Sequence, residues 1–225
     1  KALVKSPVML GMEQGKIVRV EELTRIAADV QDSLITVLSE KSISIPELNQ
    51  DIQAIEGFNL IATANDRDKG VNELSSALKR RFNTIVLPVP DSIEEEARIV
   101  KHRVEQTNRL LQAPLEKKAL DELRKVITIF RELRTGATTD GGMKLRSPSS
   151  TLSTAEAISV LNNSISLSVC FGNGEITSLE TAKSIIGTVI KEPLNDKNVL
   201  TEYNENVIKD RVGWSDLYKN LKELL

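Results

Sequence analysis

Two adjacent carboxylates close a short apolar run near the beginning of the sequence. The run from Ile17 to Val20 is interrupted only by Arg19, and Glu21 and Glu22 follow it directly. At the tip of a strand such a pair suits a nucleotide hydrolase, in which one acid holds Mg²⁺, usually through water, and the next orients and polarises the attacking water. Taken alone, the pair is explained better by a strand that ends in a solvated acidic turn.

An uncharged amide follows a second apolar run. The stretch from Phe58 to Ala62 predicts a strand buried on both faces of a parallel sheet, and Asn65 lies just beyond its tip, where such sheets bind ligands. An amide at this place can donate to a phosphate oxygen and accept from water. Asn65 by itself is explained equally by a turn cap, and its pairing with the acidic strand favours the ligand-binding role.

Three cations end the next predicted helix. The segment from Asn72 to Arg81 reads as a short helix that closes with Lys79, Arg80 and Arg81. Cations at a helix C-terminus are favourable for the helix dipole, which explains them without any function. A guanidinium on a rigid helix end can also reach a neighbouring subunit's nucleotide as an arginine finger, which raises rates by roughly 10³ to 10⁵.

The elements that must position these residues fall into two parts with a boundary near residue 90. In the first part we expect, besides the two strands, a helix over 28–41 with Asp29 near its start as a cap, and a hairpin whose turn is Pro46 to Asp51. A last buried strand is predicted from Thr84 to Leu87, ended by the prolines that follow it.

Everything beyond Asp91 is helical in pattern. The apolar spacing predicts helices over about 93–111, 115–133, 153–171, 179–191, 199–210 and 214–224. The acids from Asp91 to Glu96 are expected to cap and solvate a helix start, and Trp214 and Tyr218 to form a packing stripe. A long loop from Thr135 to Ser150, rich in Gly, Ser and Thr, carries Lys144 and Arg146.

The composition sets limits on the function. Of the 225 residues 40% are hydrophobic, and 30 Lys and Arg face 32 Asp and Glu, so no overall field favours nucleic acid or an anionic membrane. The single cysteine, Cys170, excludes a disulfide framework and a thiol metal cluster, and the lone His102 reads as a surface residue. No run reaches the roughly 18 apolar residues of a membrane span. We expect a soluble, cytoplasmic protein.

The order and spacing of these segments resemble the AAA+ ATPases of the MoxR group. The resemblance is close from Pro7 to Pro90 and looser over the helical remainder, and it rests on four segments: Ile17 to Glu22, Glu22 to Arg25, Ile61 to Asn65 and Ala77 to Phe82. It implies an α/β fold class, with a partial AAA+ parallel sheet and flanking helices in residues 1–90, followed by an all-helical lid domain in residues 91–225.

The resemblance also implies roles for individual residues. Glu21 would be the metal-binding acid of the Walker B motif and Glu22 its catalytic acid, Asn65 would be sensor 1, and Arg81 the arginine finger with Arg80 as the substitute. The hairpin would be the insertion that precedes sensor 1. ATP and Mg²⁺ are the implied cofactors, and the implied partners are further copies in a ring, a hexamer, and a protein substrate or adaptor.

The sequence departs from the family pattern in three ways. Glu21 replaces the usual Asp and is longer by one methylene, about 1.5 Å. In place of a Ser-Pro-Arg stretch that offers a sensor 2 arginine, the chain has Arg146-Ser147-Pro148-Ser149, so Arg146, or in second place Lys144, would take this nucleotide-binding role unless both lie in a solvated basic loop. No Gly-x-x-x-x-Gly-Lys-Ser/Thr phosphate loop is present. We therefore expect that upstream sequence is missing and that this chain is inactive alone.

Three functions follow, in descending order. The first is an ATP-hydrolysing motor, a phosphoanhydride hydrolase in the intact parent, that remodels a protein or helps to insert a metal or cofactor into a target. The second is a non-catalytic interaction scaffold derived from the AAA+ fold. The third, a DNA-remodelling motor, is weakened by the small number of basic residues, which cluster at the proposed finger.

Overall fold

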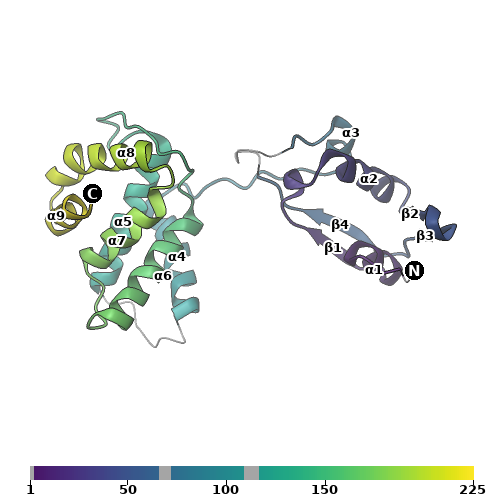
Figure 1. Cartoon of the computed structure of the whole chain (residues 1–225), viewed down its shortest axis with the longest axis horizontal. Coiled ribbons are helices and arrows are strands. Elements are labelled where there is room, and N and C mark those ends of the chain that lie inside the picture. Colours follow the sequence, from purple (N-terminus) through teal and green to yellow (C-terminus); the bar gives the residue numbers. More distant parts are fainter. Residues whose placement is uncertain (1–2, 66–71, 109–116) are drawn as a thin grey trace. The chain divides into compact units, whose positions relative to one another are not determined.

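The chain divides into two compact units, Lys1–Leu87 and Pro88–Leu225 (Figure 1). The computed structural model describes residues 3–65, 72–108 and 117–225. Each unit has its own hydrophobic clusters, and each is described by itself below.

A pair of parallel strands forms the sheet of the first unit. Strand β1 (Ile17–Val20) pairs with β4 (Asn59–Ala62), and Val20 lies opposite Ala62 at the carboxyl end of both. This confirms the two strands predicted from the apolar runs. Because the strands are parallel, whatever follows Val20 and Ala62 emerges at the same edge of the sheet.

Only one face of this sheet is covered by the described residues. The side chains of Leu60 and Val20 pack in a cluster with Leu34 of α2 (Ala28–Ser39), which runs alongside the sheet (Figure 1). On the opposite face Ile17 is 64% exposed and Ile61 is 54% exposed. The prediction that β4 is buried on both faces is therefore wrong, since no described element packs on the second face.

Helix α1 (Pro7–Gln14) was not expected from the sequence and packs beside β1. Ser6 caps it by accepting a hydrogen bond from the amide of Met9, and Pro7 occupies its first turn, where a missing N–H does no harm. Gly15 ends the helix in the left-handed region at φ 62°. A Cβ at Gly15 would lie 2.3 Å from the Glu56 carbonyl oxygen, so this close approach requires glycine.

The helix predicted over 28–41 is α2, but its cap differs from the expectation. Ala27 is the capping residue and makes no side-chain hydrogen bond, while Asp29 lies in the first turn. The prediction of Asp29 as a cap is wrong. The carboxylate still lies near the positive end of the helix dipole, which is favourable without a capping bond.

The hairpin is confirmed. Strands β2 (Ser42–Ile45) and β3 (Gln50–Gln53) are antiparallel, and a 3₁₀ turn (Pro46–Leu48) joins them. The second strand begins two residues before the predicted Ile52, because Asn49 adopts the left-handed conformation at φ 49° and completes the turn there.

The last part of the first unit contains less regular structure than predicted. Helix α3 covers only Ser76–Lys79, with Ser75 as its cap, because the backbone N–H of Asn72 donates to the Thr24 carbonyl instead of entering a helix. The strand predicted from Thr84 to Leu87 is wrong. Leu87 is 87% exposed, and the segment pairs with no strand of the described chain. A strand forms only where a neighbour accepts its backbone hydrogen bonds.

The second unit is helical, as predicted. It consists of α4 (Ile93–Thr107), α5 (Lys117–Thr135), α6 (Thr154–Phe171), α7 (Ser178–Val189), α8 (Pro193–Asn206) and α9 (Ser215–Leu224) around one apolar core. Helix α8 begins six residues before the predicted Val199 because Pro193 is acceptable in a first turn. Trp214 and Tyr218 pack against the core, which confirms their role as a packing stripe.

Candidate functional site

The acidic pair lies at the carboxyl edge of the sheet, beside the tip of β4. The backbone N–H of Glu22 donates to Thr63 Oγ1 at 3.1 Å, and that of Leu23 donates to the Thr63 carbonyl at 2.8 Å. These bonds extend the strand pairing by two residues beyond Val20. They hold Glu22 next to the segment that leads from β4 to Asn65.

Glu22 has an uncommon backbone conformation. Its φ of 53° and ψ of 49° lie in the left-handed region, which costs a non-glycine residue roughly 1 kcal/mol or more. The adjacent Leu23 is only 1% exposed, and its burial together with the Thr63 bonds compensates for the strain. Such strained residues cluster at functional sites, so the conformation supports a functional role for this turn.

Both carboxylates are exposed and paired with arginines. Glu21 forms an ion pair with Arg19 at 2.5 Å and Glu22 forms one with Arg25 at 2.7 Å, with 59% and 65% of the two glutamate side chains exposed. Exposed ion pairs contribute only about 0 to 1 kcal/mol. Little free energy would therefore oppose the exchange of either arginine for another cation.

Asn65 lies at the same edge of the sheet. Its backbone carbonyl accepts a hydrogen bond from Thr24 Oγ1 at 3.5 Å, and Thr24 is buried two residues after Glu22. The structure thus brings Glu21, Glu22 and Asn65 together at one edge. Sequence reasoning missed the role of Thr24 and Thr63 as the bridges between the two strand tips, although the polar residues just after each strand were a usable signal.

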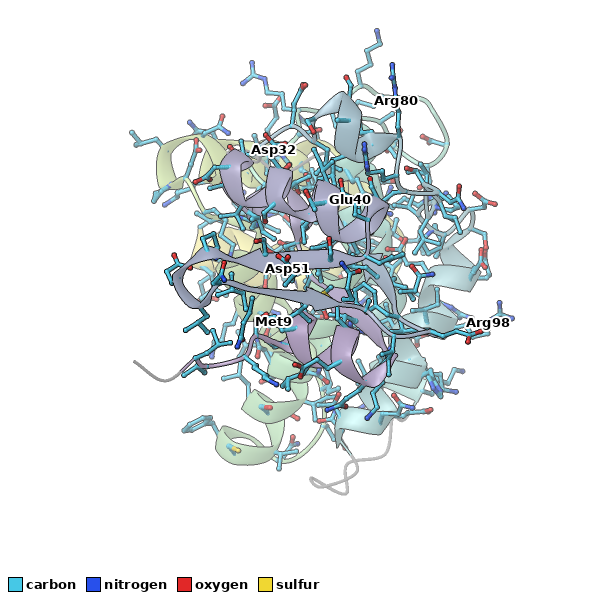
Figure 2. The ribbon with its side chains drawn as sticks, turned by 90° about the vertical axis from the view of Figure 1, so that its right-hand side faces the viewer. Met9, Asp32, Glu40, Asp51, Arg80 and Arg98 are labelled. Carbon is cyan, nitrogen blue, oxygen red and sulfur yellow. The ribbon has the colours of Figure 1, made fainter. Side chains whose placement is uncertain are left out.

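The basic residues of α3 are not part of this group. Arg81 Nη1 donates to the Ala77 carbonyl at 2.7 Å, and its Nε donates to Ser39 Oγ at the last residue of α2. Helix α2 begins just after the acidic turn and is 12 residues long, about 18 Å. Arg81 therefore lies at the opposite end of α2 from the acids. Arg80 extends outward from the end of α3 (Figure 2).

Lys144 and Arg146 lie in the second unit, on a loop that packs beside α8. Ala137 and Lys144 form an isolated antiparallel bridge, and Arg146 makes an ion pair with Glu202 at 3.7 Å while 75% of its side chain remains exposed. The two cations and Glu202 line a shallow pocket together with Tyr203. Both basic side chains are accessible.

Ser149, in contrast, is turned inward. Its backbone N–H and its hydroxyl each donate to the buried carboxylate of Asp196 at 2.7 Å. The N–H groups of Lys191 and Glu192 donate to the same carboxylate. Burial acts to raise the pKa of Asp196, but the hydrogen bonds from Glu192 and Ser149 outweigh it and hold the pKa well below its usual range. The clamp fixes the Ser-Pro-Ser stretch to the junction of α7 and α8.

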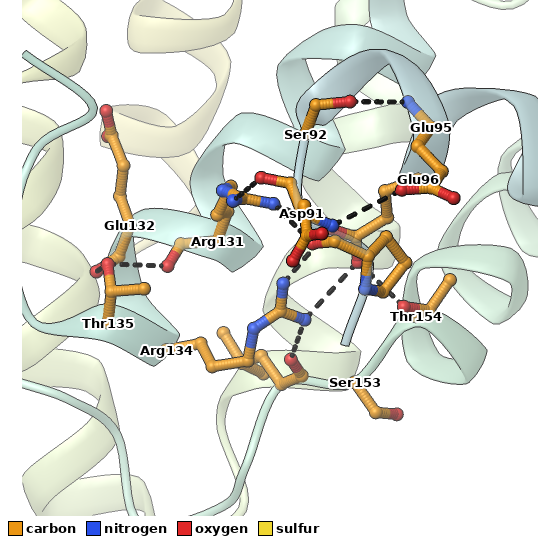
Figure 3. A network of polar contacts seen from close by, with 12 residues as sticks. Asp91, Ser92, Glu95, Glu96, Arg131, Glu132, Arg134, Thr135, Ser153 and Thr154 are labelled. Carbon is orange, nitrogen blue, oxygen red and sulfur yellow. Dashed lines mark hydrogen bonds and ion pairs between the residues drawn. The ribbon is translucent and has the colours of Figure 1, made fainter. Parts of the chain in front are cut away.

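A second buried carboxylate corrects a prediction about the start of α4. Glu96 is fully buried and does not solvate the helix end; it pairs with Arg134 at 3.0 Å and accepts from Thr154 Oγ1 at 2.8 Å (Figure 3). Arg134 also donates to the Leu152 carbonyl. The pair ties α4 to α5 and to the start of α6. Nothing in the local pattern from Asp91 to Glu96 distinguished this acid from its exposed neighbours.

The third buried carboxylate, Glu132, was also missed. It is fully buried in α5, and it accepts from the Thr139 amide, the hydroxyls of Thr139 and Tyr203, and the Arg211 guanidinium. Burial acts to raise the pKa of Glu132, but these hydrogen bonds outweigh it and lower the pKa. An acid three residues from the buried Ile129, on the apolar side of a helix, was the available signal.

The chemistry of the acidic edge can be compared with the ligand preferences of Mg²⁺. Carboxylate oxygens are suitable ligands for Mg²⁺, and a site that keeps several waters needs only one or two of them. Glu21 and Glu22 supply these oxygens at an accessible edge. Among residues 3–65, 72–108 and 117–225, no group of three or more His, Cys, Asp or Glu side chains forms a complete protein metal cage. The residues fit a cation that shares its ligands with water and phosphate.

No helix in the described part of the chain is both long and apolar enough to cross a membrane.

Comparison with known proteins identifies both units. Residues 1–82 match the AAA domain of the dynein-related subfamily, and residues 94–225 match the YehL-like AAA+ ATPase C-terminal domain. The chain is 36% identical to the uncharacterized protein YehL of Escherichia coli (strain K12) over 211 residues, which cover 91% of this chain and 57% of YehL. It is 32% identical over 83 residues to an uncharacterized protein of Staphylococcus aureus (strain USA300), which covers 36% of this chain and 32% of that protein.

The chain thus spans little more than half the length of YehL. The match to the YehL-like C-terminal domain, by contrast, extends over more than half of the chain, across helices α4 to α9. Together with the AAA match over the acidic edge, this shows that the chain belongs to the YehL-like family of AAA+ ATPases.

Proposed function

We propose that this chain works within an ATP-hydrolysing motor whose phosphate-binding loop lies outside these 225 residues. The observation that carries the proposal is the meeting of two accessible carboxylates and Asn65 at one edge of a parallel sheet, where ligands bind in folds of this class. The chain alone would hydrolyse little or no ATP, because phosphate binding needs the missing loop.

The residues at the sheet edge would divide the work. Glu21 would hold Mg²⁺, Glu22 would orient and polarise the attacking water, and Asn65 would contact the terminal phosphate. The strain at Glu22 supports this assignment, because an acid that must approach a water molecule gains from a fixed backbone. When bound, Mg²⁺ supplies positive charge that neutralises the phosphates.

The position of Arg81 supports a role in a neighbouring subunit. Since Arg81 lies at the far end of α2 from Glu22, it would act on the nucleotide of another copy, with Arg80 as the substitute. Such an arrangement requires a ring, and we propose a hexamer by analogy with the family. The guanidinium would stabilise charge that develops in the transition state.

The second unit would serve as the lid. We assign residues 1–90 to the α/β core of the AAA+ module and residues 91–225 to the lid domain. Because Ser149 is committed to Asp196, the nucleotide-binding cation of the lid would be Arg146, with Lys144 as the second candidate. The weak pair of Arg146 with Glu202 would open when a phosphate is offered.

The work done by the motor would be of the MoxR kind. The chain would act in the cytoplasm on a protein substrate or adaptor, either by remodelling it or by helping to insert a metal or cofactor into it. The order of the acidic strand, the hairpin, the Asn65 strand and the basic helix end supports this assignment.

The test is the ATPase activity of the full-length protein and of its Glu22→Gln variant. We expect turnover to fall by at least about 100-fold, because the amide cannot act as the base that polarises water. Glu40→Gln, at the exposed end of α2, is the matched control and should leave turnover unchanged. Undiminished turnover in Glu22→Gln, with the control intact, would count against the motor.

A non-catalytic scaffold is the second candidate. The observation that favours it is the inward clamp of Ser149, which stands where the family pattern has an arginine. If this candidate is right, the full-length protein neither binds nor hydrolyses ATP. Equilibrium binding of a fluorescent ATP analogue at several Mg²⁺ concentrations separates the two functions.

A further inference from the structure

The loop over residues 136–146, which carries Lys144 and Arg146, is a small folded unit. Within it the Thr138 amide donates to the Met143 carbonyl at 3.0 Å and the Leu145 amide donates to the Gly136 carbonyl at 2.8 Å. Gly136 and Gly141 both have a φ of 70°, which glycine adopts without strain. The internal hydrogen bonds make the 136–146 loop move as one body.

This body is tied to the helices through Glu132. The amide of Thr139, at the tip of the loop, donates to Glu132 Oε1 at 2.7 Å, and the Thr139 hydroxyl donates to the same oxygen. The other carboxylate oxygen accepts from the Tyr203 hydroxyl of α8 at 2.5 Å. Glu132 therefore fixes the loop to two separate helices at once.

Arg211 compensates the buried charge. Its guanidinium pairs with Glu132 Oε1 and lies over the Trp214 ring at 4.8 Å from the ring centre. Glu132 is thus held by donors from the loop, from α8 and from the segment that precedes α9. An acid this well satisfied keeps one geometry, because any departure would leave a buried charge without its partners.

The consequence for Arg146 comes from the placement of its partner. Glu202, which pairs with Arg146, precedes Tyr203, and Tyr203 donates to Glu132. The backbone of the 136–146 loop and the α8 surface against which Arg146 rests are therefore both fixed by the same carboxylate. The Arg146 head remains free to exchange Glu202 for another anion, since the pair is exposed.

We propose that Glu132 is a positioning residue that presents Arg146 to the nucleotide phosphates by holding the 136–146 loop against α8. This inference rests on the proposed function, and it names the element of the lid on which that function depends. Glu132 itself does not touch the nucleotide. Its effect on ATP binding passes through Thr139 and the loop to Arg146.

The experiment is a double-mutant cycle on the full-length protein with Thr139→Val and Arg146→Ala. Thr139 is exposed at the loop tip, so the valine variant removes one tether bond without leaving a charge unpaired in the core. We expect each single variant to raise the KM for ATP, by about fivefold for Thr139→Val and about tenfold for Arg146→Ala, with kcat less affected. In the Arg146→Ala background, Thr139→Val should add less than about twofold.

The control is Thr128→Val, which removes a hydroxyl that only bonds back to the Arg124 carbonyl on the same helix. It should leave KM unchanged. Glu132→Gln is a second, stronger variant, with the thermal midpoint measured in parallel to detect unfolding. Additive effects of Thr139→Val and Arg146→Ala would overturn the proposal, as would an unchanged KM in Thr139→Val.

A measurement without turnover distinguishes this proposal from the motor itself. In the 225-residue chain, amide hydrogen exchange of residues 136–146 should become about tenfold faster in Thr139→Val and stay unchanged in Thr128→Val. Faster exchange with an unchanged KM would overturn the positioning role while the motor stands. Unchanged exchange would also overturn it. Absence of turnover in the unmodified full-length protein would sink both.

Discussion

Ser149 donates its backbone N–H and its hydroxyl to the two carboxylate oxygens of Asp196, each at 2.7 Å. The clamp joins the end of the long loop to the junction of α7 and α8, and it commits to packing a position where the family pattern has a cation. Every strong polar contact of this loop goes to a buried carboxylate, Asp196 or Glu132. The loop is therefore part of the folded core of its unit.

Asp196→Ala should destabilise the chain by about 3 kcal/mol or more, because the N–H groups of Ser149, Lys191 and Glu192 lose their acceptor in a buried place. Urea unfolding followed by circular dichroism measures the change. Asp121→Asn, an exposed acid on α5, is the control and should change the free energy of unfolding by less than about 0.5 kcal/mol. Equal effects in both variants would contradict the clamp.

The stability of the chain should fall in acid because of the same group. The pKa of Asp196 is lowered in the folded state, so between this pKa and the ordinary aspartate value of about 3.9 the unfolded chain binds a proton that the folded chain does not. The stabilisation is thus present above about pH 4 and is lost as the pH falls.

Unfolding midpoints measured from pH 7 to pH 3 check this pH dependence. Below pH 5 the wild-type chain should lose stability more steeply than Asp196→Asn, which has no proton to bind at this position. The lowered pKa of Glu132 acts in the same direction in both proteins. Parallel curves for the two proteins would show that Asp196 does not contribute.

Arg134→Ala should cost about 3 to 5 kcal/mol, because it leaves the fully buried Glu96 without its cation (Figure 3). The double variant Glu96→Met/Arg134→Met, which removes both charges and keeps the volume, should recover at least half of that loss. Denaturant unfolding of the three proteins decides. If the double variant is as unstable as the single one, then the shape of the pair matters more than its charge.

Two glycine substitutions should have opposite signs. At Gly15, with φ at 62° and a carbonyl oxygen 2.3 Å from the position of a new Cβ, alanine should destabilise by roughly 1 to 3 kcal/mol. Gly187 lies in helix α7 with no heavy atom within 4 Å of such a Cβ, and alanine there should stabilise by about 0.5 to 1 kcal/mol. Thermal melts of both variants give the comparison, and shifts of the same sign would contradict it.

Mixing two inactive variants tests the assignment of the finger. In the full-length protein Arg81→Ala should lower kcat by roughly 10³ with little change in the KM for ATP, and Arg80→Ala should have a smaller effect. When Arg81→Ala subunits are mixed with Glu22→Gln subunits, some interfaces combine an intact Glu22 with an intact Arg81, so activity should rise above that of either variant. A mixture no more active than its parts would argue against action between subunits.

The sequence predicted those parts of the fold that depend on local pattern. The parallel strands, the hairpin and helices α4 to α9 were recognisable, because apolar spacing and capping residues act within a few positions along the chain. The meeting of Glu22 and Asn65 followed from one rule, that parallel strands end at a common edge. The predicted strand from Thr84 to Leu87 failed because a strand also needs a partner that the described chain does not provide.

Which charged side chains are buried was decided by the tertiary structure alone. Glu96, Glu132 and Asp196 look like surface acids in the sequence, and each is buried because donors from distant segments converge on it. A carboxylate can leave water only where several such donors replace its hydration, and their arrangement depends on how helices pack. Residue type and spacing specify which groups can ionise, whereas only three-dimensional packing determines which of them find enough partners to be buried.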